Sequence, residues 1–425
     1  MRSVLKVGSA NAVVNIFSLL NGVLFIGFLS RYISIDEFAS WTWINSSVAL
    51  CAISDLYLLL FAQNLITREF ANGKRRFADF IFRYMFYLQL IFAGMLGIVI
   101  FGIIQVFNFK GLAVFADQSV GILFGIALIV QLASQSLSIF GIYFGGRGDS
   151  DKANLFLLCK SVGQNLIYVI AFLCGANFFF SSILYFIFGP LFLLLFYKKG
   201  ELTYKPYKFR MTIKKLKWTF LYLWTRGNLA VWGALRVVDS FRNNIALMIG
   251  YFSLSSTALV DYVFVARLNT LMLVISTGLF NPLVPKILEL KTKGSTKALS
   301  EIIAHVLLIT LGIGAFYCAS MGLLTERIVT IWSGRTIELK LVFIVSMTLS
   351  GVLQVLHTLM WNILLGLDDI SALLKLSIVS VIVSTFMLLI LLPSITELAL
   401  PVAIIMGSAT FFILGYFNVK KMLLS

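Results

Sequence analysis

Apolar runs of about 20 residues recur along this 425-residue chain, separated by short polar connectors. Hydrophobic residues make up 60% of the sequence and charged residues 12%, about half the charged fraction of a typical soluble protein. A run of this length spans a bilayer as an α-helix, and the runs lack the alternation that barrel strands require. The sequence therefore predicts an all-α polytopic membrane protein.

We predict about twelve transmembrane helices in two six-helix lobes. The expected spans are 10–30, 41–64, 81–107, 119–144, 154–174, 180–197, 218–250, 257–283, 302–324, 340–363, 374–392 and 399–418. A basic cytoplasmic linker, residues 198–217, separates the N-terminal lobe (1–197) from the C-terminal lobe (218–425).

The connectors predict the orientation, because cytoplasmic loops carry an excess of Lys and Arg. With both termini in the cytoplasm, most basic residues fall on the cytoplasmic side, and the other side holds Arg31, Lys110, Arg327, Arg335 and Lys340. This bias accounts for the net charge of +16, so no nucleic-acid partner is expected. The four cysteines fall within apolar runs and form no CxxC pair, so we expect them to be packing residues and neither disulfides nor metal ligands. No cofactor is expected.

The stretch from Leu221 to Pro285 breaks the pattern, since it places charges inside two apolar spans. They are Arg226, Arg236, Asp239, Arg242, Asp261 and Arg267. Helical rise puts Asp239, Arg242 and Arg267 at similar depths, roughly 12–16 Å below the outer end. Ionisable groups at this depth usually face a protein interior or a water-filled cavity. We therefore predict a cationic cavity for an anionic substrate.

An internal ion pair is the alternative, because Asp239 could neutralise Arg236, Arg242 or Arg267 and hold two helices together. Such pairing would not consume all the charge, since arginines outnumber aspartates in this stretch. The excess suits a pyrophosphate, because the guanidinium fork binds phosphate oxygens in pairs and stays charged.

The N-terminal lobe offers amides in place of this charge. Asn21 and other amide side chains of this lobe could bind sugar hydroxyls or bridge helices. Asp55 could form an ion pair with an arginine of the other lobe. Lys160 is expected to reach towards the inner interface. His305 and His357 are expected to be hydrogen-bonded packing residues, with proton relay as the alternative. Intramembrane charge is therefore expected in the C-terminal lobe, with sugar-binding amides opposite.

The two halves share a faint repeat. Tyr32-Ile33-Ser34-Ile35 corresponds to Tyr251-Phe252-Ser253-Leu254, and Gly146-Arg147-Gly148-Asp149 corresponds to Gly366-Leu367-Asp368-Asp369 at nearly the same separation along the chain. With six spans per half, these matches predict a parallel repeat. Transporters built this way bind substrate between their halves.

Four features carry a resemblance: the corner at Tyr32, the loop Arg147-Gly148-Asp149, Asp239 eleven residues before Gly250, and the span ending Leu279-Phe280-Asn281-Pro282. In their order and spacing, the chain resembles the polysaccharide-flippase branch of the multidrug/oligosaccharidyl-lipid/polysaccharide exporter (MOP) superfamily, the Wzx-type O-antigen flippases. The resemblance implies a V-shaped, MATE-like fold and alternating access.

The implied substrate is an undecaprenyl-pyrophosphate-linked oligosaccharide, flipped from the cytoplasmic to the outer leaflet of the bacterial inner membrane. The implied partners are a polymerase and a chain-length regulator, with proton or sodium coupling. The substrate-binding residues would be Arg226, Arg236, Asp239, Arg242, Arg267, Asp55 and Asn21.

Other functions fit less well. The basic site disfavours a multidrug exporter, and twelve spans instead of fourteen disfavour a lipid II flippase. A polytopic O-antigen polymerase or glycosyltransferase would need a larger outer loop than Thr325 to Glu338. No GxxxxGK[ST] sequence occurs, so the chain has no nucleotide-hydrolysing site of that kind. We expect a transporter that is not an enzyme.

Overall fold

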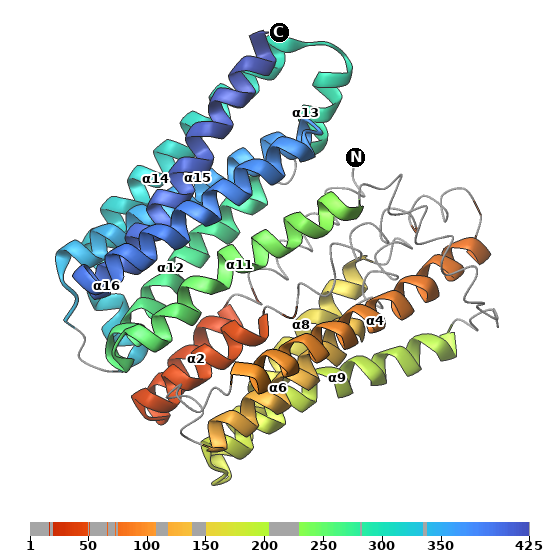
Figure 1. Cartoon of the computed structure of the whole chain (residues 1–425), viewed down its shortest axis with the longest axis vertical. Helices are drawn as coiled ribbons and strands as arrows, with labels where there is room; N and C mark the ends of the chain where they lie inside the picture. Colours follow the sequence, from red (N-terminus) through yellow and green to blue (C-terminus); the bar gives the residue numbers. More distant parts are fainter. Residues whose placement is uncertain are drawn as a thin grey trace. The chain divides into compact units, whose positions relative to one another are not determined.

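The computed structural model describes residues 17, 20–49, 51, 66, 73, 75–107, 118–137, 150–203, 229–280, 283–334 and 338–424. Regular structure in these ranges is entirely helical (Figure 1). A helix over residues 20–32 is followed by α2 (Ile35–Ala49), α4 (Arg75–Phe107), α6 (Gln118–Leu137), α8 (Ser150–Leu173), α9 (Phe178–Thr203), α11 (Leu229–Ser253), α12 (Ser256–Phe280), α13 (Leu283–Thr292), α14 (Thr296–Ser333), α15 (Leu341–Gly366) and α16 (Ile370–Leu424).

Seven helices of the described part are long and apolar enough to cross a membrane, judged by length and composition. They lie in α4, α8, α9, α12, α14, α15 and α16, where the sequence predicts spans. Large apolar side chains such as Leu24, Ile98 and Leu323 are exposed on these and neighbouring helices, as expected for surfaces that face lipid. The all-helical architecture is confirmed, whereas the total of twelve spans and the cytoplasmic termini stay predictions.

Helix α16 is two helices in sequence. Its backbone leaves the helical region at Ile395 and Thr396. Ser384 and Gly407 lie equally far from this break on its two sides, and a Cβ built at Gly407 would approach the Ser384 Cβ to 2.8 Å. Ser380 Oγ also donates a hydrogen bond of 2.8 Å to the Gly407 carbonyl. The two parts therefore pack antiparallel, as the separate predicted spans 374–392 and 399–418 require.

The chain divides into two compact units that exchange short segments. One unit holds Met1–Phe25 with Ile44–Ser240, and the other holds Ile26–Trp43 with Phe241–Ser425. In the first, α9 packs against α6 and α8, and α4 packs against α6; in the second, α15 packs against α12, α13, α14 and α16 (Figure 1). The predicted division at residues 198–217 stays a prediction, because residues 204–217 lie outside the described ranges.

Helix starts support the predicted repeat. Three helices of the first half have counterparts in the second: α2 at Ile35 corresponds to α12 at Ser256, α4 at Arg75 to α14 at Thr296, and α8 at Ser150 to α16 at Ile370. The first two separations along the chain are equal, and the third is almost the same. The packing of α4 on α6 is also matched by that of α14 on α15. A near-constant separation across three helices indicates that one arrangement occurs twice along the chain.

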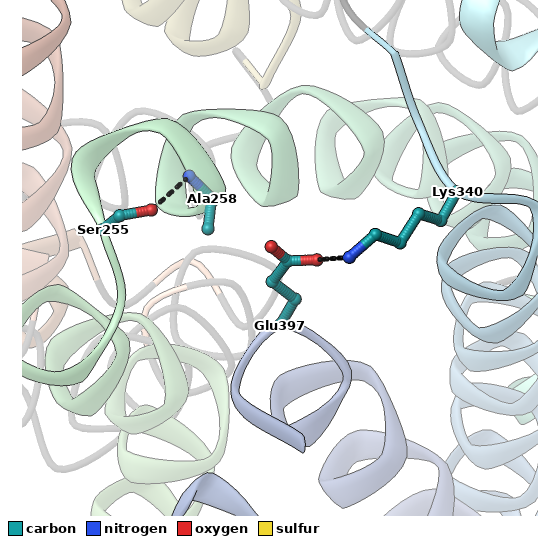
Figure 2. Close-up of polar contacts among 4 residues, drawn as sticks. All are labelled: Ser255, Ala258, Lys340 and Glu397. Carbon is teal, nitrogen blue, oxygen red and sulfur yellow. Dashed lines mark hydrogen bonds and ion pairs between the residues drawn. The ribbon is translucent and has the colours of Figure 1, made fainter. Parts of the chain in front are cut away.

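Capping residues correct the predicted register at the first corner. Ser34 Oγ accepts from the Glu37 N–H while Glu37 Oε2 accepts from the Ser34 N–H, a capping box that starts α2 at Ile35. In the second half, Ser255 Oγ accepts from the Ala258 N–H at 3.2 Å and starts α12 (Figure 2). The counterpart of Ser34 is therefore Ser255, and the sequence-based match to Ser253 was wrong. Helix α2 likewise begins before the predicted span at 41, because polarity near Ser34 concealed its start.

One end of the second unit carries an exposed ion pair. Lys340 Nζ lies 3.3 Å from Glu397 Oε2, joining the residue before α15 to the break in α16 (Figure 2). Side-chain exposures of 78% and 47% mean that solvent screens the pair, so its contribution to stability is small.

The sequence did not predict α13, which lies between the predicted spans 257–283 and 302–324. Lys291, in its last turn, donates a hydrogen bond to the Leu367 carbonyl just after α15. This short basic helix is therefore stabilised by packing against α15. The hydropathy of the sequence cannot predict such a contact between helices.

Substituting Gly407→Leu tests the hairpin in α16. The added side chain would meet Ser384 and the Ser380 carbonyl within 3 Å, so overpacking should cost about 1–3 kcal/mol of folding free energy. Thermal unfolding of the purified protein should show a melting temperature several degrees lower. The matched control is Gly322→Leu, because no atom lies within 4 Å of a Cβ built there; equal melting temperatures for the two variants would contradict the hairpin.

Candidate functional site

The predicted charged stripe lies on α11. Arg236, Asp239 and Arg242 follow one another at intervals of three residues, so they share one side of the helix. The division between the two units falls just after Ser240, so Arg242 belongs to the second unit and the other two to the first. Two further predicted site residues, Arg226 and Asp55, lie outside the described ranges.

In the first unit, Arg236 and Asp239 form an ion pair. Arg236 Nη1 lies 3.8 Å from Asp239 Oδ2, and the side chains are 22% and 15% exposed. Removing one partner of a pair this far from solvent would leave an uncompensated charge, which is costly. Asp239 therefore pairs with an arginine, as the alternative expects, but both residues lie on α11, so this contact does not join two helices.

In the second unit, Arg242 is held by neutral groups of α15. Its Nη1 contacts His357 Nε2, and its Cζ lies 5.7 Å from the centroid of the Trp361 ring. His357 also stacks on Phe411 of α16, with ring centroids 3.8 Å apart. A guanidinium over an indole ring is a cation–π contact, so α11, α15 and α16 jointly position this arginine.

The contact with Arg242 fixes the state of His357. A guanidinium can only donate, so His357 Nε2 must accept, and the imidazole is neutral with its proton on Nδ1. His357 is 3% exposed, and within the described residues its Nδ1 has no hydrogen-bond partner. The expectation that His357 is a hydrogen-bonded packing residue is confirmed, while proton relay stays untested.

The role of His357 and Trp361 in holding Arg242 was not visible in the sequence. The two residues lie one turn apart on α15, but His357 is 115 residues from Arg242. Their only sequence signal is a polar and an aromatic side chain at i, i+4 in an apolar span.

Arg267 lies on α12 with an exposed side chain. Two residues later, Asn269 is buried and bonded to two other helices: its Nδ2 donates to the Met347 carbonyl at 2.9 Å, and its Oδ1 accepts from the Tyr317 hydroxyl at 2.7 Å. Gly351 leaves room for this amide. The sequence reading missed Asn269, which serves packing. The grouping of Asp239, Arg242 and Arg267 in one cavity stays a prediction.

Asn21 bridges helices in the first unit. Its Nδ2 donates to Ser161 Oγ at 3.1 Å, and its carbonyl accepts from Asn165 Nδ2 at 3.4 Å. Of the two roles left open for the N-terminal amides, the structure shows helix bridging for Asn21. Sugar binding stays a prediction.

Solved structures with similar folds are transporters. The chain superposes on an inward-facing multidrug resistance MATE family transporter of the MOP superfamily with a TM-score of 0.72, at 14% identity, covering 97% of this chain and 98% of that one. A Vibrio cholerae MATE transporter gives a TM-score of 0.66 at 14% identity, with 100% and 98% covered. A MOP superfamily transporter from Pyrococcus furiosus gives 0.63 at 14% identity, with 98% and 95% covered.

These similarities establish the fold. The chain has the fold of MATE transporters of the MOP superfamily, and the MATE-like expectation is confirmed at that level. No known protein-family profile matches the chain, and no curated protein sequence matches it. Membership of the Wzx-type flippases stays a prediction.

Replacing His357 tests how Arg242 is held. His357→Phe keeps a stacking ring but removes the acceptor, so it should cost about 1.5–3 kcal/mol, typical of a hydrogen bond to a charged group. His357→Gln, which retains an acceptor, should cost less. Thermal unfolding of single and double variants with Arg242→Met should show coupling between the two positions. His305→Phe is the control, since His305 is exposed on α14; strictly additive effects at Arg242 and His357 would contradict the contact.

Replacing Asp239 distinguishes pairing from proton transfer. Asp239→Asn removes the negative charge beside Arg236, so the protein should be less abundant in membranes, and a further Arg236→Gln should restore part of the loss. Quantitative immunoblotting of membrane fractions measures this. Glu397→Gln, which breaks the exposed pair with Lys340, should leave abundance unchanged. A fully abundant Asp239→Asn protein that has lost transport would instead indicate a proton carrier.

Proposed function

We propose that this chain is an alternating-access transporter that flips undecaprenyl-pyrophosphate-linked oligosaccharide units from the cytoplasmic to the outer leaflet of the bacterial inner membrane. A cationic site in the C-terminal half binds the pyrophosphate. The saccharide is the repeat unit of an O-antigen or a similar polysaccharide.

The observation that carries the proposal is the environment of Arg242. Two of its contacts, with His357 and Trp361, come from α15 and position the guanidinium. A guanidinium stays charged under all relevant conditions. A fixed positive charge on a helix of an apolar bundle suits an anionic ligand.

The charge balance of α11 and α12 supports the same conclusion. These two helices carry three arginines, Arg236, Arg242 and Arg267, against two aspartates, Asp239 and Asp261. Pairs of arginines suit pyrophosphate because each guanidinium fork matches two phosphate oxygens.

The fold supports transport but not a particular substrate. Relatives of this fold are described in inward-facing and outward-facing conformations, which is the basis for proposing alternating access. Those relatives are multidrug transporters, and the fold alone suits that function equally well. The Pyrococcus furiosus transporter is described as having a binding pocket of reverse polarity that suggests a different function. Pocket charge therefore varies within this fold, and the arginines favour an anion here.

The proposal also names what surrounds the transporter. A polymerase and a chain-length regulator would receive the flipped unit at the outer leaflet. Since the sequence carries no GxxxxGK[ST] motif, the energy would come from an ion gradient such as protons or sodium, from the membrane potential, or from consumption of the product.

Pyrophosphate binding to the purified full-length protein tests the site, measured by isothermal titration calorimetry. Arg242→Gln should weaken binding about tenfold or more, because it removes a charged partner of the anion. Arg242→Lys should be intermediate, since it keeps the charge and loses the fork. Melting temperatures recorded without ligand identify any variant that has simply unfolded.

The matched control is Arg327→Gln, because Arg327 is exposed near the end of α14 and should not affect binding. Tetraphenylphosphonium, a lipophilic cation, serves as the opposing ligand. Binding of this cation without any binding of pyrophosphate would contradict the proposal and favour a multidrug exporter.

A further inference from the structure

One end of the second unit carries an excess of exposed lysines. The segment 283–297, which covers α13 and the start of α14, holds four lysines and one glutamate. Helix α16 starts beside the end of α15 and folds back at its break, so its C-terminus lies at this end too (Figure 1). The exposed lysines of these segments are Lys286, Lys291, Lys293, Lys297, Lys420 and Lys421. Acids are fewer at this end: Glu289, Glu301, Asp368 and Asp369.

The other end of the same helices has mixed charge. Its exposed charged residues include Glu326, Glu338, Glu397, Arg327 and Lys340. The lysine excess is therefore a property of one end and not of the whole unit. It is the end that the charges of the connectors predict to be cytoplasmic.

Close packing fixes α13 on the end of α15. A Cβ built at Gly366 would lie 2.9 Å from Ile287 Cβ and 3.0 Å from the Val284 carbonyl oxygen, so only a glycine lets the two helices approach this closely. Lys291 Nζ also donates a hydrogen bond to the Leu367 carbonyl. The lysines of α13 are therefore presented on a helix that is bonded to the bundle.

A tight turn joins α13 to α14. Gly294 has a φ of 67°, the left-handed conformation that favours glycine at the end of a helix. The Ser295 N–H donates to the Leu290 carbonyl at 3.0 Å, and α14 begins at the next residue. This turn brings Lys293 and Lys297, from two different helices, to the same end of the unit.

The two sides of α13 differ in exposure. Ile287 and Leu290 are buried, whereas Leu288 is 43% exposed. On a helix, Leu288 points away from the side that these two residues share. An exposed leucine among lysines is typical of a helix that lies at the boundary between lipid headgroups and acyl chains.

The last turns of α16 indicate where the membrane surface lies at this end. Tyr416 and Phe417 are exposed, and the exposed Lys420 and Lys421 follow them one turn later. Aromatic side chains gather at membrane interfaces, and lysines reach from there to the headgroups. Figure 1 shows α13 at the same end of the unit as the C-terminus.

We propose that α13 and the turn after it form a binding surface for anionic phospholipid headgroups, through Lys286, Lys291, Lys293 and Lys297. An ammonium group has three N–H donors, so Lys291 keeps two for phosphate oxygens while it bonds to α15. Leu288 meets the upper part of the acyl chains. An acidic protein segment would leave this leucine in water, so the combination favours a lipid. The surface is separate from the proposed pyrophosphate site and does not depend on which substrate is carried.

Lipid titrations of the purified full-length protein in neutral detergent, followed by native mass spectrometry, test this surface. The probes are dioleoyl phosphatidylglycerol, which is anionic, and dioleoyl phosphatidylcholine, which is neutral and has the same acyl chains. The wild-type protein should bind phosphatidylglycerol more tightly by about fivefold or more, because each lysine near a headgroup adds to the attraction. Lys293→Gln combined with Lys297→Gln should remove most of this preference, and the two Lys→Arg substitutions should keep it.

The matched control removes the same amount of charge from the other end of the unit. Arg327→Gln combined with Lys340→Gln should leave the preference for phosphatidylglycerol unchanged, because both side chains are exposed at that end. Melting temperatures recorded without added lipid show whether each variant is folded. An excess of inorganic phosphate should not displace phosphatidylglycerol from the wild-type protein.

Four results would overturn the inference. They are equal affinity for the two lipids, a preference that survives the substitution of Lys293 and Lys297, an equal loss in the control variant, and displacement of the lipid by inorganic phosphate. Displacement would assign the lysines to a free anion. Equal affinity for the two lipids, together with binding of a polyglutamate peptide, would assign the surface to an acidic protein partner.

Discussion

Lipid offers no hydrogen bonds, so a polar side chain inside an apolar helix gains stability when it bonds to another helix or to its own backbone. The bond between Arg242 and His357 is the contact on which the functional account depends. It fixes a charge of α11 against α15, and the stacking of His357 on Phe411 adds α16. The same constraint explains packing elsewhere: Asn269 binds α14 and α15 through the gap at Gly351. Glycines leave room for close contacts between helices, and polar side chains determine which helices bond to each other.

Much of the fold could be predicted from hydropathy, because a span needs length and apolar composition, and both are local properties. The two parts of α16 illustrate this, since the predicted spans 374–392 and 399–418 lie on either side of the break at Ile395. Helix α13 could not be predicted in this way, because its short basic sequence is stabilised by contact with α15. The register of the repeat was wrong because it was based on matching residue types. The helices begin where Ser34 and Ser255 cap them, and these caps give the correct register.

Some contacts around the candidate site could be predicted from the sequence, and others could not. Spacing along α11 correctly suggested that Asp239 lies beside an arginine, because residues three apart share a helix face. Spacing could not show that Arg242 meets His357, since that contact depends on how distant helices pack. Lys160 shows the same limit: its depth along α8 was calculable, but the contact of its side chain with Gly189 of α9 was not.

The most direct measurement of the central claim is translocation by the purified protein in proteoliposomes. A fluorescent polyprenyl-pyrophosphate-linked oligosaccharide is placed in one leaflet, and its arrival in the other is followed by a membrane-impermeant quencher. The account predicts transfer that depends on the protein, is slowed by Arg242→Gln, and does not occur for the same lipid lacking its pyrophosphate. Transfer at the rate of protein-free vesicles, together with active transport of a lipophilic cation, would contradict it.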